Sequence, residues 1–178
     1  MGMHTGMQFR RANAADIAAV VALVESAYRG NASRAGWTTE ADLLDGQRTD
    51  AAEVGALVAA ADSRILIVED AAGLLGSVLL ADRAGTAYIG MLAVRPTAQG
   101  QGVGRALLAE AERVARETLG HATARMTVLI QRPELCAWYE RRGYRRSGQR
   151  EPFPYGDPRF GLPRRSDLSF EVLIKTLV

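Results

Sequence analysis

A glycine-rich segment at the start of an expected helix is the strongest chemical signal in the sequence. Residues 91–108 read MLAVRPTAQGQGVGRALL, so an apolar strand runs directly into the glycines of residues 99–104. Glycine lets the backbone turn tightly and present its N–H groups to a ligand without a side chain in the way. The N-terminus of the following helix adds unpaired donors and the positive end of the helix dipole. These features predict an anion site suited to a pyrophosphate.

Three interpretations compete for these glycines. A P-loop needs Lys and then Ser or Thr after its second glycine, but Arg105 and Ala106 follow the last glycine here. A dinucleotide site needs Gly-x-Gly-x-x-Gly and an acid at the end of the next strand, whereas these glycines are spaced two apart and residues 129–131 hold no acid. The third interpretation is a turn that only packs a helix on a strand. The glycines alone leave it open.

A second motif follows the next expected strand. A helix opened by Pro133 ends in Tyr-Glu-Arg-Arg-Gly-Tyr at residues 139–144. With the glycine segment it resembles the GNAT acetyltransferase superfamily, whose acyl-CoA-binding motif is Gln/Arg-x-x-Gly-x-Gly/Ala after a strand ending Leu-x-Val-x-Pro. The resemblance covers about residues 9–144, and the residues that match the first motif are Leu92, Val94, Pro96, Gln99, Gly102 and Gly104.

The resemblance implies an enzyme that moves an acetyl group from acetyl-CoA to an amine of a small molecule or peptide by direct attack. It implies that Tyr139 is the general acid that protonates the leaving thiolate. Packing on the core is the alternative role for this ring. The residues implied for acetyl-CoA binding are Leu92, Ala93, Val94, Gln99, Gly100, Gln101, Gly102, Val103, Gly104 and Arg105.

The acceptor side is less defined in the sequence. The resemblance places Tyr28 and Trp37 in the acceptor wall, with Tyr155 as a weaker candidate, although Trp37 could equally cap the core. Aromatic rings and nearby carboxylates, including Asp157, suit a cationic amine. No carboxylate lies on the strand at residues 86–94, and Glu40, Asp42 and Asp157 are unranked candidates for the general base.

One position departs from the family pattern. Many members carry asparagine seven residues before the tyrosine of the second motif, and this chain carries Arg132. The usual polar contact to the pantetheine arm is therefore in doubt. We expect Arg132 to face phosphate or solvent instead.

The order of expected elements indicates one mixed α/β layer. A short edge strand at residues 7–11 precedes a helix at 13–28, a second helix start at Thr38 or Thr39, and a helix at 50–62. Thr39 and Asp42 have capping-box spacing. Strands at 64–69, 74–81 and 86–94 follow, and Gly90 marks a bulge or a close backbone approach. The remaining expected elements are a helix at 103–119, a strand at 124–130, a helix at 133–142, a strand at 144–148, a loop at 151–163 and a last strand within 167–178.

With the resemblance, this order predicts an α/β fold of GNAT type. We expect a mixed, mostly antiparallel central sheet flanked by helices, in a single N-acetyltransferase domain of residues 1–178. A chain of this length with 48% hydrophobic residues can bury one sizeable core.

Composition limits the remaining function classes. The net charge of +2 is too small to indicate nucleic acid by itself, and we expect neither a membrane partner nor a metal. One cysteine, Cys136, and no apolar run long enough to cross a bilayer favour the cytoplasm. We expect a monomer or homodimer. Two alternatives stay open: a non-catalytic acyl-CoA sensor, and an RNA- or ribosome-associated protein acetyltransferase that docks through the arginines of residues 141–150.

Overall fold

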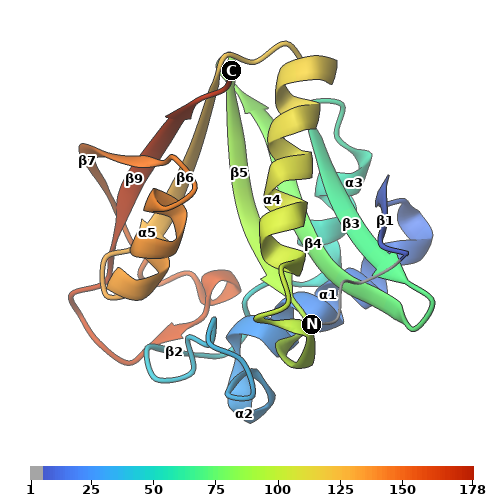
Figure 1. Ribbon diagram of the computed structural model, residues 1–178. Coiled ribbons are helices and arrows are strands. Elements are labelled where there is room, and N and C mark those ends of the chain that lie inside the picture. The colour runs from blue at the N-terminus through green and yellow to red at the C-terminus, as the bar shows by residue number, and fades with distance from the viewer. Residues whose placement is uncertain (1–5) are drawn as a thin grey trace.

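Seven of the strands form one twisted sheet that opens in its middle (Figure 1). The computed structural model describes residues 6–178, and within them a seven-stranded sheet has the order β1-β3-β4-β5-β6-β9-β7. Only β5 and β6 pair in parallel, so the predicted mixed and mostly antiparallel sheet is confirmed. Its strands are β1 (Gln8–Arg11), β3 (Ser63–Asp70), β4 (Gly73–Arg83), β5 (Thr86–Val94), β6 (Thr123–Leu129), β7 (Arg145–Pro152) and β9 (Ser169–Thr176).

Helices cover both faces of the sheet because the residues of its strands alternate between two apolar cores. Val78 and Leu80 of β4 pack in the core that also holds Leu107 of α4, whereas Leu79 packs in the core of α1 and α3. In Figure 1, α4 crosses the front of the sheet, and α1 and α3 lie behind it. The helices are α1 (Ile17–Tyr28), α2 (Gly30–Ser33), α3 (Ala51–Ala59), α4 (Val103–Arg113) and α5 (Pro133–Glu140).

The parallel pair β5 and β6 separates soon after it begins. Ala87 pairs with Ala124 and Tyr88 with Arg125, and no later residue of β5 has a partner in β6. The two strands diverge toward the lower part of Figure 1, where α5 lies in front of β6 and β9. The outer edge of β5 beyond Tyr88 is thus free of a strand partner, which exposes backbone donors and acceptors to whatever fills the gap.

A bulge lies at the same part of β5. The register with β4 shifts so that Leu79 pairs with Gly90 but Ser77 pairs with Ala93, which leaves one extra residue in β5. Met91 carries this irregularity with a φ of 49°. Gly90 also allows a close approach, because a Cβ there would lie 2.7 Å from Cε1 of Tyr88. The prediction that Gly90 marks a bulge or a close approach is confirmed.

Two predicted helix starts are confirmed by their caps. Asn13 accepts from the N–H of Ala15 and forms a capping box with Asp16 before α1. Asp50 accepts from the N–H of Glu53 at the start of α3. The sequence signals here agree with the fold because the side-chain oxygens satisfy donors that the first helical turn cannot.

The prediction that a second helix starts at Thr38 or Thr39 is wrong. Residues 34–43 form turns, and the Thr39 hydroxyl bonds to Ser33 and accepts from the N–H of Ala41 instead of capping a helix. Asp42, the other half of the supposed capping box, pairs with Arg34. A short pairing of β2 (Leu44–Asp45) with β8 (Leu162–Pro163) was also missed, and it ties this region to the predicted loop at 151–163.

The other boundaries lie close to their predictions. The helix expected at 103–119 consists of α4 and a π-helical turn, Val114–Thr118, and it ends before Gly120, whose φ is 74°. Strand β7 extends further than the predicted 144–148 and forms an edge of the sheet with a charged sequence, RRSGQREP. Charged side chains on an edge strand oppose pairing with other chains.

We predict opposite effects on stability for alanine at two glycines. A Cβ at Gly76 in β4 would lie 2.9 Å from the Ala93 carbonyl oxygen and 3.2 Å from Cδ2 of Leu107, so Gly76→Ala should lower the free energy of unfolding by about 1–3 kcal/mol. A Cβ at Gly55 in α3 would meet only Ile17, at 3.6 Å, and Gly55→Ala should raise it by up to about 1 kcal/mol. Urea titration measures both, and equal stabilities for the two variants would contradict the packing described for Gly76.

Candidate active site

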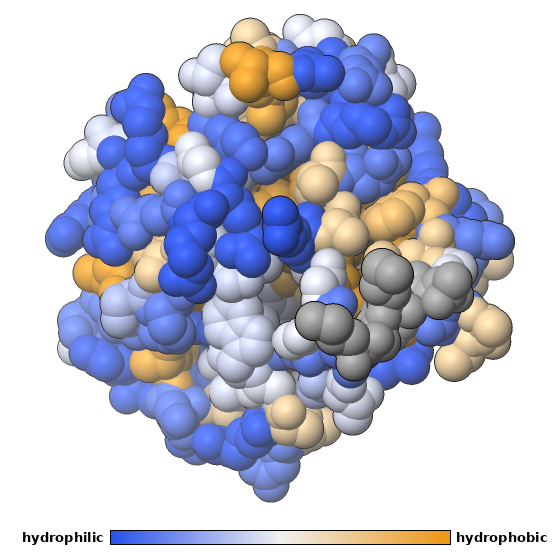
Figure 2. Space-filling model, in the orientation of Figure 1, coloured by the Kyte–Doolittle hydropathy of each residue, from blue (hydrophilic) through white to orange (hydrophobic). Residues whose placement is uncertain are grey.

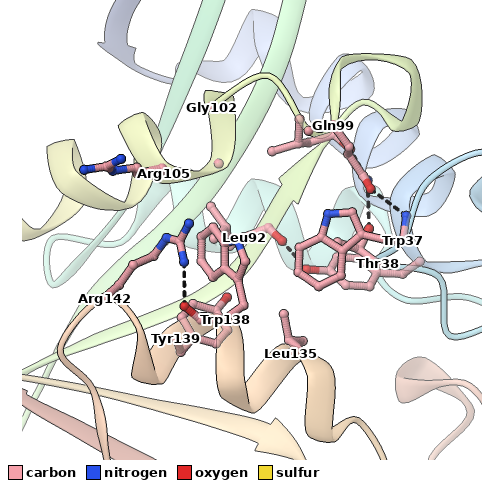
Figure 3. Close-up of a pocket in the computed structure, with 14 residues that line it drawn as sticks. Trp37, Thr38, Leu92, Gln99, Gly102, Arg105, Leu135, Trp138, Tyr139 and Arg142 are labelled. Atoms are coloured by element: carbon pink, nitrogen blue, oxygen red, sulfur yellow. Dashed lines mark hydrogen bonds between the residues drawn. The ribbon is translucent and has the colours of Figure 1, made fainter.

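A cavity of about 340 Å³ lies between the glycine segment and α5 (Figure 3). It brings together three segments far apart in the sequence: the end of α1 with the following loop, the end of β5 with the start of α4, and the length of α5. Its lining residues are Tyr28, Trp37, Thr38, Leu92, Val94, Gln99, Gly100, Gly102, Gly104, Arg105, Leu135, Trp138, Tyr139 and Arg142. Ten of these were predicted as site residues from the sequence.

The start of α4 faces this cavity with free backbone donors. Gly102 is the N-cap with a φ of 83°, a conformation that favours glycine, and it supplies no capping side chain. The first intrahelical bond runs from the N–H of Ala106 to the Gly102 carbonyl at 3.0 Å, so the preceding N–H groups have no acceptor one turn back. Donors and the positive dipole end therefore meet at one point, as an anion site requires.

The free edge of β5 forms the floor of the cavity. The Tyr28 hydroxyl donates to the Leu92 carbonyl, and Nε2 of Gln99 donates to the Val94 carbonyl at 3.0 Å. Both carbonyls point away from β4, and in an extended strand the N–H of a residue points to the same side as its carbonyl. The Leu92 and Val94 N–H groups consequently face the gap. Since side chains already occupy both carbonyls, this edge offers donors to a ligand.

Tyr139 lies at the centre of the cavity wall. Its side chain is buried on α5, yet its hydroxyl has no hydrogen-bond partner among residues 6–178. Burial raises the pKa of Tyr139 well above its ordinary value, so the hydroxyl stays protonated at neutral pH. A protonated phenol with a free hydroxyl in a cavity is equipped to donate a proton.

Three more residues of α5 and its C-terminal end line the cavity and were missed. Leu135 precedes Tyr139 by four positions, and Arg142 follows it by three, so helical spacing puts them on the same face. Trp138 lies under the Arg142 guanidinium, whose Cζ is 3.5 Å from the ring centroid, and its carbonyl accepts from Arg142 at 2.7 Å. The periodicity around Tyr139 was the signal that could have found them.

The Gln99 side chain joins the glycine segment to the loop after α2. Its Oε1 accepts from the Trp37 N–H at 2.8 Å, and its Nε2 donates to the Thr38 hydroxyl at 2.8 Å (Figure 3). Trp37 is 41% exposed, and its ring lies 6.1 Å from that of Trp138 across the cavity. Trp37 therefore lines the cavity of the glycine segment, and Gln99 holds it there.

Arg132 is buried, so the expectation that it faces phosphate or solvent is wrong. Its side chain is 3% exposed and lies 3.5 Å from Glu40, which also pairs with Arg29 at 2.5 Å. It also donates to the Trp37 carbonyl at 3.4 Å and lies 3.6 Å from the exposed Glu134. Two arginines thus flank Glu40. A buried charge without a partner is costly, and here one carboxylate is the partner of two guanidinium groups.

A second cavity of about 450 Å³ meets the first. Four residues line both: Tyr28, Leu92, Leu135 and Tyr139. The second cavity extends past the bulge of β5 toward α3 and the loop after β7. Its charged lining residues are Arg29, Glu40, Arg48, Glu53, Arg83 and Glu151. The hydroxyl-bearing residues Tyr28 and Tyr139 therefore stand where two chambers connect.

Other predicted site residues line neither cavity. The Ala93 carbonyl faces β4, 2.9 Å from a Cβ placed at Gly76, while Gln101 is exposed and the Val103 side chain is buried in the core. Tyr155 is 46% exposed, and its hydroxyl donates to the Arg165 carbonyl and accepts from the Leu168 N–H.

The nearby acids line neither cavity and are paired elsewhere. Asp42 pairs with Arg34, Asp45 with Arg164 and Asp157 with Arg159. Their charges are neutralised by arginine before any ligand enters.

The basic residues of 141–150 divide into two groups. Arg146 pairs with Glu140 and Arg150 with Glu171, whereas Arg141 and Arg142 face α4. Figure 2 shows hydrophilic side chains gathered across the middle of the face that carries α4 and α5. A groove there is lined by Arg105, Arg141, Arg142 and Lys175 together with Leu108, Ala109 and Glu112. It adjoins the first cavity through Arg105 and Arg142.

The described residues hold neither a cluster of metal ligands nor an exposed thiol. Within residues 6–178 no group of three or more His, Cys, Asp and Glu could hold a metal ion. Cys136 is buried in the apolar core, and burial raises the pKa of its thiol. No helix of the described residues is long and apolar enough to cross a membrane.

A known protein family matches the part of the chain that forms most of this site. Residues 61–146 match the sequence profile of the acetyltransferase (GNAT) domain, and they include the bulged strand, the glycine segment and Tyr139. The chain carries a GNAT acetyltransferase domain. The predicted GNAT-like fold is confirmed with it. A search of curated proteins gave no match to the sequence.

Solved structures share the fold of this GNAT domain over nearly the whole chain. An acetyltransferase of the GNAT family from Desulfovibrio desulfuricans is 20% identical with a TM-score of 0.71, covering 97% of this chain and 99% of that one. A spermidine/spermine N-acetyltransferase from Vibrio cholerae is 17% identical with a TM-score of 0.69, covering 99% and 95%. The ribosomal-protein-S18-alanine N-acetyltransferase of Escherichia coli is 15% identical with a TM-score of 0.71, covering 96% and 94%. One fold thus carries acceptors as different as a polyamine and a protein.

We predict that Gln99→Ala frees the loop around Trp37. Removing its bonds to Trp37, Thr38 and Val94 should lower the free energy of unfolding by about 1–2 kcal/mol and speed hydrogen exchange of the Trp37 amide. Gln101→Ala is the matched control, because that exposed side chain makes one bond, of 3.4 Å, to the Thr97 carbonyl. Equal exchange of the Trp37 amide in both variants would contradict the role of Gln99.

Proposed function

We propose that the protein transfers an acetyl group from acetyl-CoA to an amine by direct attack of the amine on the thioester. The observation that carries this proposal is the meeting of two cavities at the free edge of β5 and the unpaired hydroxyl of Tyr139. One chamber has the donors of a phosphate site, and the other is free to take an acceptor. The reacting groups would meet where the chambers connect. A cytoplasmic setting, where acetyl-CoA and reduced thiols occur, is part of the same proposal.

The first chamber suits acetyl-CoA along its length. The N–H groups at the start of α4, with Gly102 and Gly104 beside them, would take the pyrophosphate. Arg105 and Arg141 of the adjoining groove, where Lys175 is already paired with Glu112, would take the remaining phosphate of CoA. The N–H groups of Leu92 and Val94 would then bind the pantetheine arm and the thioester carbonyl.

The chemistry follows from these positions. As the amine nitrogen bonds to the carbonyl carbon, negative charge moves to the carbonyl oxygen, and backbone N–H donors at the bulge stabilise it. These donors are in place before the reaction because the separation of β5 from β6 leaves them unpaired. When the intermediate collapses, the C–S bond breaks and the electron pair leaves with sulfur.

Tyr139 would give its proton to that sulfur. Because burial raises the pKa of Tyr139, the phenol is protonated before the step and regains a proton from water afterwards. The ammonium form of the acceptor loses one proton before attack, and the new amide loses a second. The thiolate takes up one proton. The nitrogen loses two, so a net one proton is released to solvent per turnover.

Two substitutions that match in size and differ in charge test the phosphate site. A Cβ at Gly104 has room, at 3.5 Å from Val94 and 3.7 Å from Trp138, and the pair Gly104→Asp and Gly104→Asn adds side chains of the same size. Asp should weaken CoA binding by about 10–100-fold relative to Asn, because only Asp opposes the pyrophosphate charge. Calorimetry with CoA measures the difference, and equal affinities in folded variants would remove the pyrophosphate from the start of α4.

The acid role of Tyr139 is tested by Tyr139→Phe. We expect kcat to fall by about 10–10³-fold with little change in the KM for acetyl-CoA, since the hydroxyl acts on the leaving thiolate. In the wild type, kcat/KM should rise with pH as the acceptor amine deprotonates. It should show no decline from Tyr139 ionisation below about pH 10, because its pKa is raised. Turnover of Tyr139→Phe equal to wild type at every pH would make Tyr139 a packing residue.

A further inference from the structure

The second cavity contains charged side chains that the protein itself leaves unpaired. Of its six charged lining residues, Glu40 pairs with Arg29, and Glu151 pairs with Arg125. Arg48, Arg83 and Glu53 form no salt bridge with any of residues 6–178. Arg83 stacks on the Tyr88 ring, with its Cζ 3.6 Å from the centroid. The guanidinium of Arg48 and the carboxylate of Glu53 therefore remain available to a ligand.

Arg48 lies beside Tyr28, which lines both cavities. Its Cζ lies 5.9 Å from the centroid of the Tyr28 ring, and the Tyr28 hydroxyl donates to the Leu92 carbonyl in the bulged part of β5. The backbone N–H groups of Arg48 and Thr49 donate to the Glu25 carboxylate at 2.6 and 2.8 Å, which fixes the loop. The Arg48 side chain is left free because Glu25 binds only its backbone.

The carboxylate that complements Arg48 is Glu53. It lies at the N-terminal end of α3, half-buried, and close enough to Arg48 for their charges to interact although no salt bridge joins them. Burial raises the pKa of Glu53, the direction that suits a group exchanging a proton with an amine. A positive and a negative group close enough for their charges to interact match a ligand that carries the opposite pair.

The surroundings exclude a purely cationic ligand. Glu40 is shared by Arg29 and Arg132, so its carboxylate is already matched by arginines and is not free to bind a cation. Most of the uncharged side chains that line the cavity are apolar, among them the rings of Phe153, Phe160 and Phe170. A polycation would meet arginines without enough free carboxylates, at a considerable cost of repulsion.

We infer that the acceptor is a free amino acid with an apolar side chain, whose carboxylate binds Arg48 and whose amine faces Glu53. This inference rests on the proposed acetyl transfer and names its substrate class. A guanidinium binds a carboxylate through paired hydrogen bonds, which a neutral amide cannot match. Peptide N-termini, which lack a carboxylate next to the amine, are poorer acceptors for the same reason, and so is a polyamine.

The test compares leucine, leucinamide and spermidine in a thiol-release assay with acetyl-CoA. Leucinamide has a less basic amine, so more of it is unprotonated at neutral pH, and an advantage of leucine must come from its carboxylate. We expect kcat/KM for leucine to exceed that for each of the other two by at least about 10-fold. Arg48→Gln should reduce the leucine-to-leucinamide ratio about 10-fold or more toward one, and Arg48→Lys should retain part of it. Arg145→Gln, an exposed arginine outside the cavities, should leave the ratio unchanged.

The outcomes separate this inference from the proposal on which it rests. Thiol release that is as fast with leucinamide or spermidine as with leucine would overturn the inference and leave acetyl transfer standing. A wild-type ratio that persists in folded Arg48→Gln and Arg48→Lys would also overturn it. No thiol release with any of the three amines, despite binding of acetyl-CoA, would overturn both.

Discussion

The separation of β5 from β6 is the constraint on which the site depends. Two paired residues at the start of β5 anchor the strands, and beyond Tyr88 the ladder stops. A strand edge inside a protein leaves backbone groups that must find partners, so the gap has to be filled. Tyr28 and Gln99 donate to two carbonyls of this edge, and α5 lines the gap with Leu135 and Tyr139. What remains unfilled is the space where the two chambers meet.

The bulge changes the direction in which the end of β5 points its backbone groups and side chains. With one extra residue at Gly90 and Met91, the end of β5 is offset relative to its first half. The side chains of Leu92 and Val94 then fall in the core with α4, although the alternation set by Ala87 and Ile89 would have placed them on the other face. A bulge next to a site is thus a means of aiming backbone donors, obtained at the cost of one residue in a left-handed conformation.

Sequence reasoning succeeded where local chemistry decides the structure. Asn13 and Asp50 cap helices through contacts within three residues, and the glycines before α4 carry their signal in their own backbone. The predicted helix start at Thr39 failed because the Thr39 hydroxyl bonds to Ser33, a contact that the capping-box spacing could not reveal. Arg132 was misplaced for the same reason, since Glu40, its partner, is far away in the sequence. The second cavity combines α3 with the loop after β7, a juxtaposition that only the tertiary fold creates.

The cluster of Arg29, Glu40 and Arg132 has a consequence for the behaviour of the protein in salt. Dissolved ions screen exposed pairs such as Arg34 with Asp42, but they screen pairs of side chains that are 3–12% exposed much less. The wall that joins the loop after α1 to the start of α5 therefore keeps its shape at high ionic strength. Contacts between the chambers and charged substrates weaken under the same conditions. Inhibition by salt accordingly measures the binding of substrates and leaves the architecture of the site untouched.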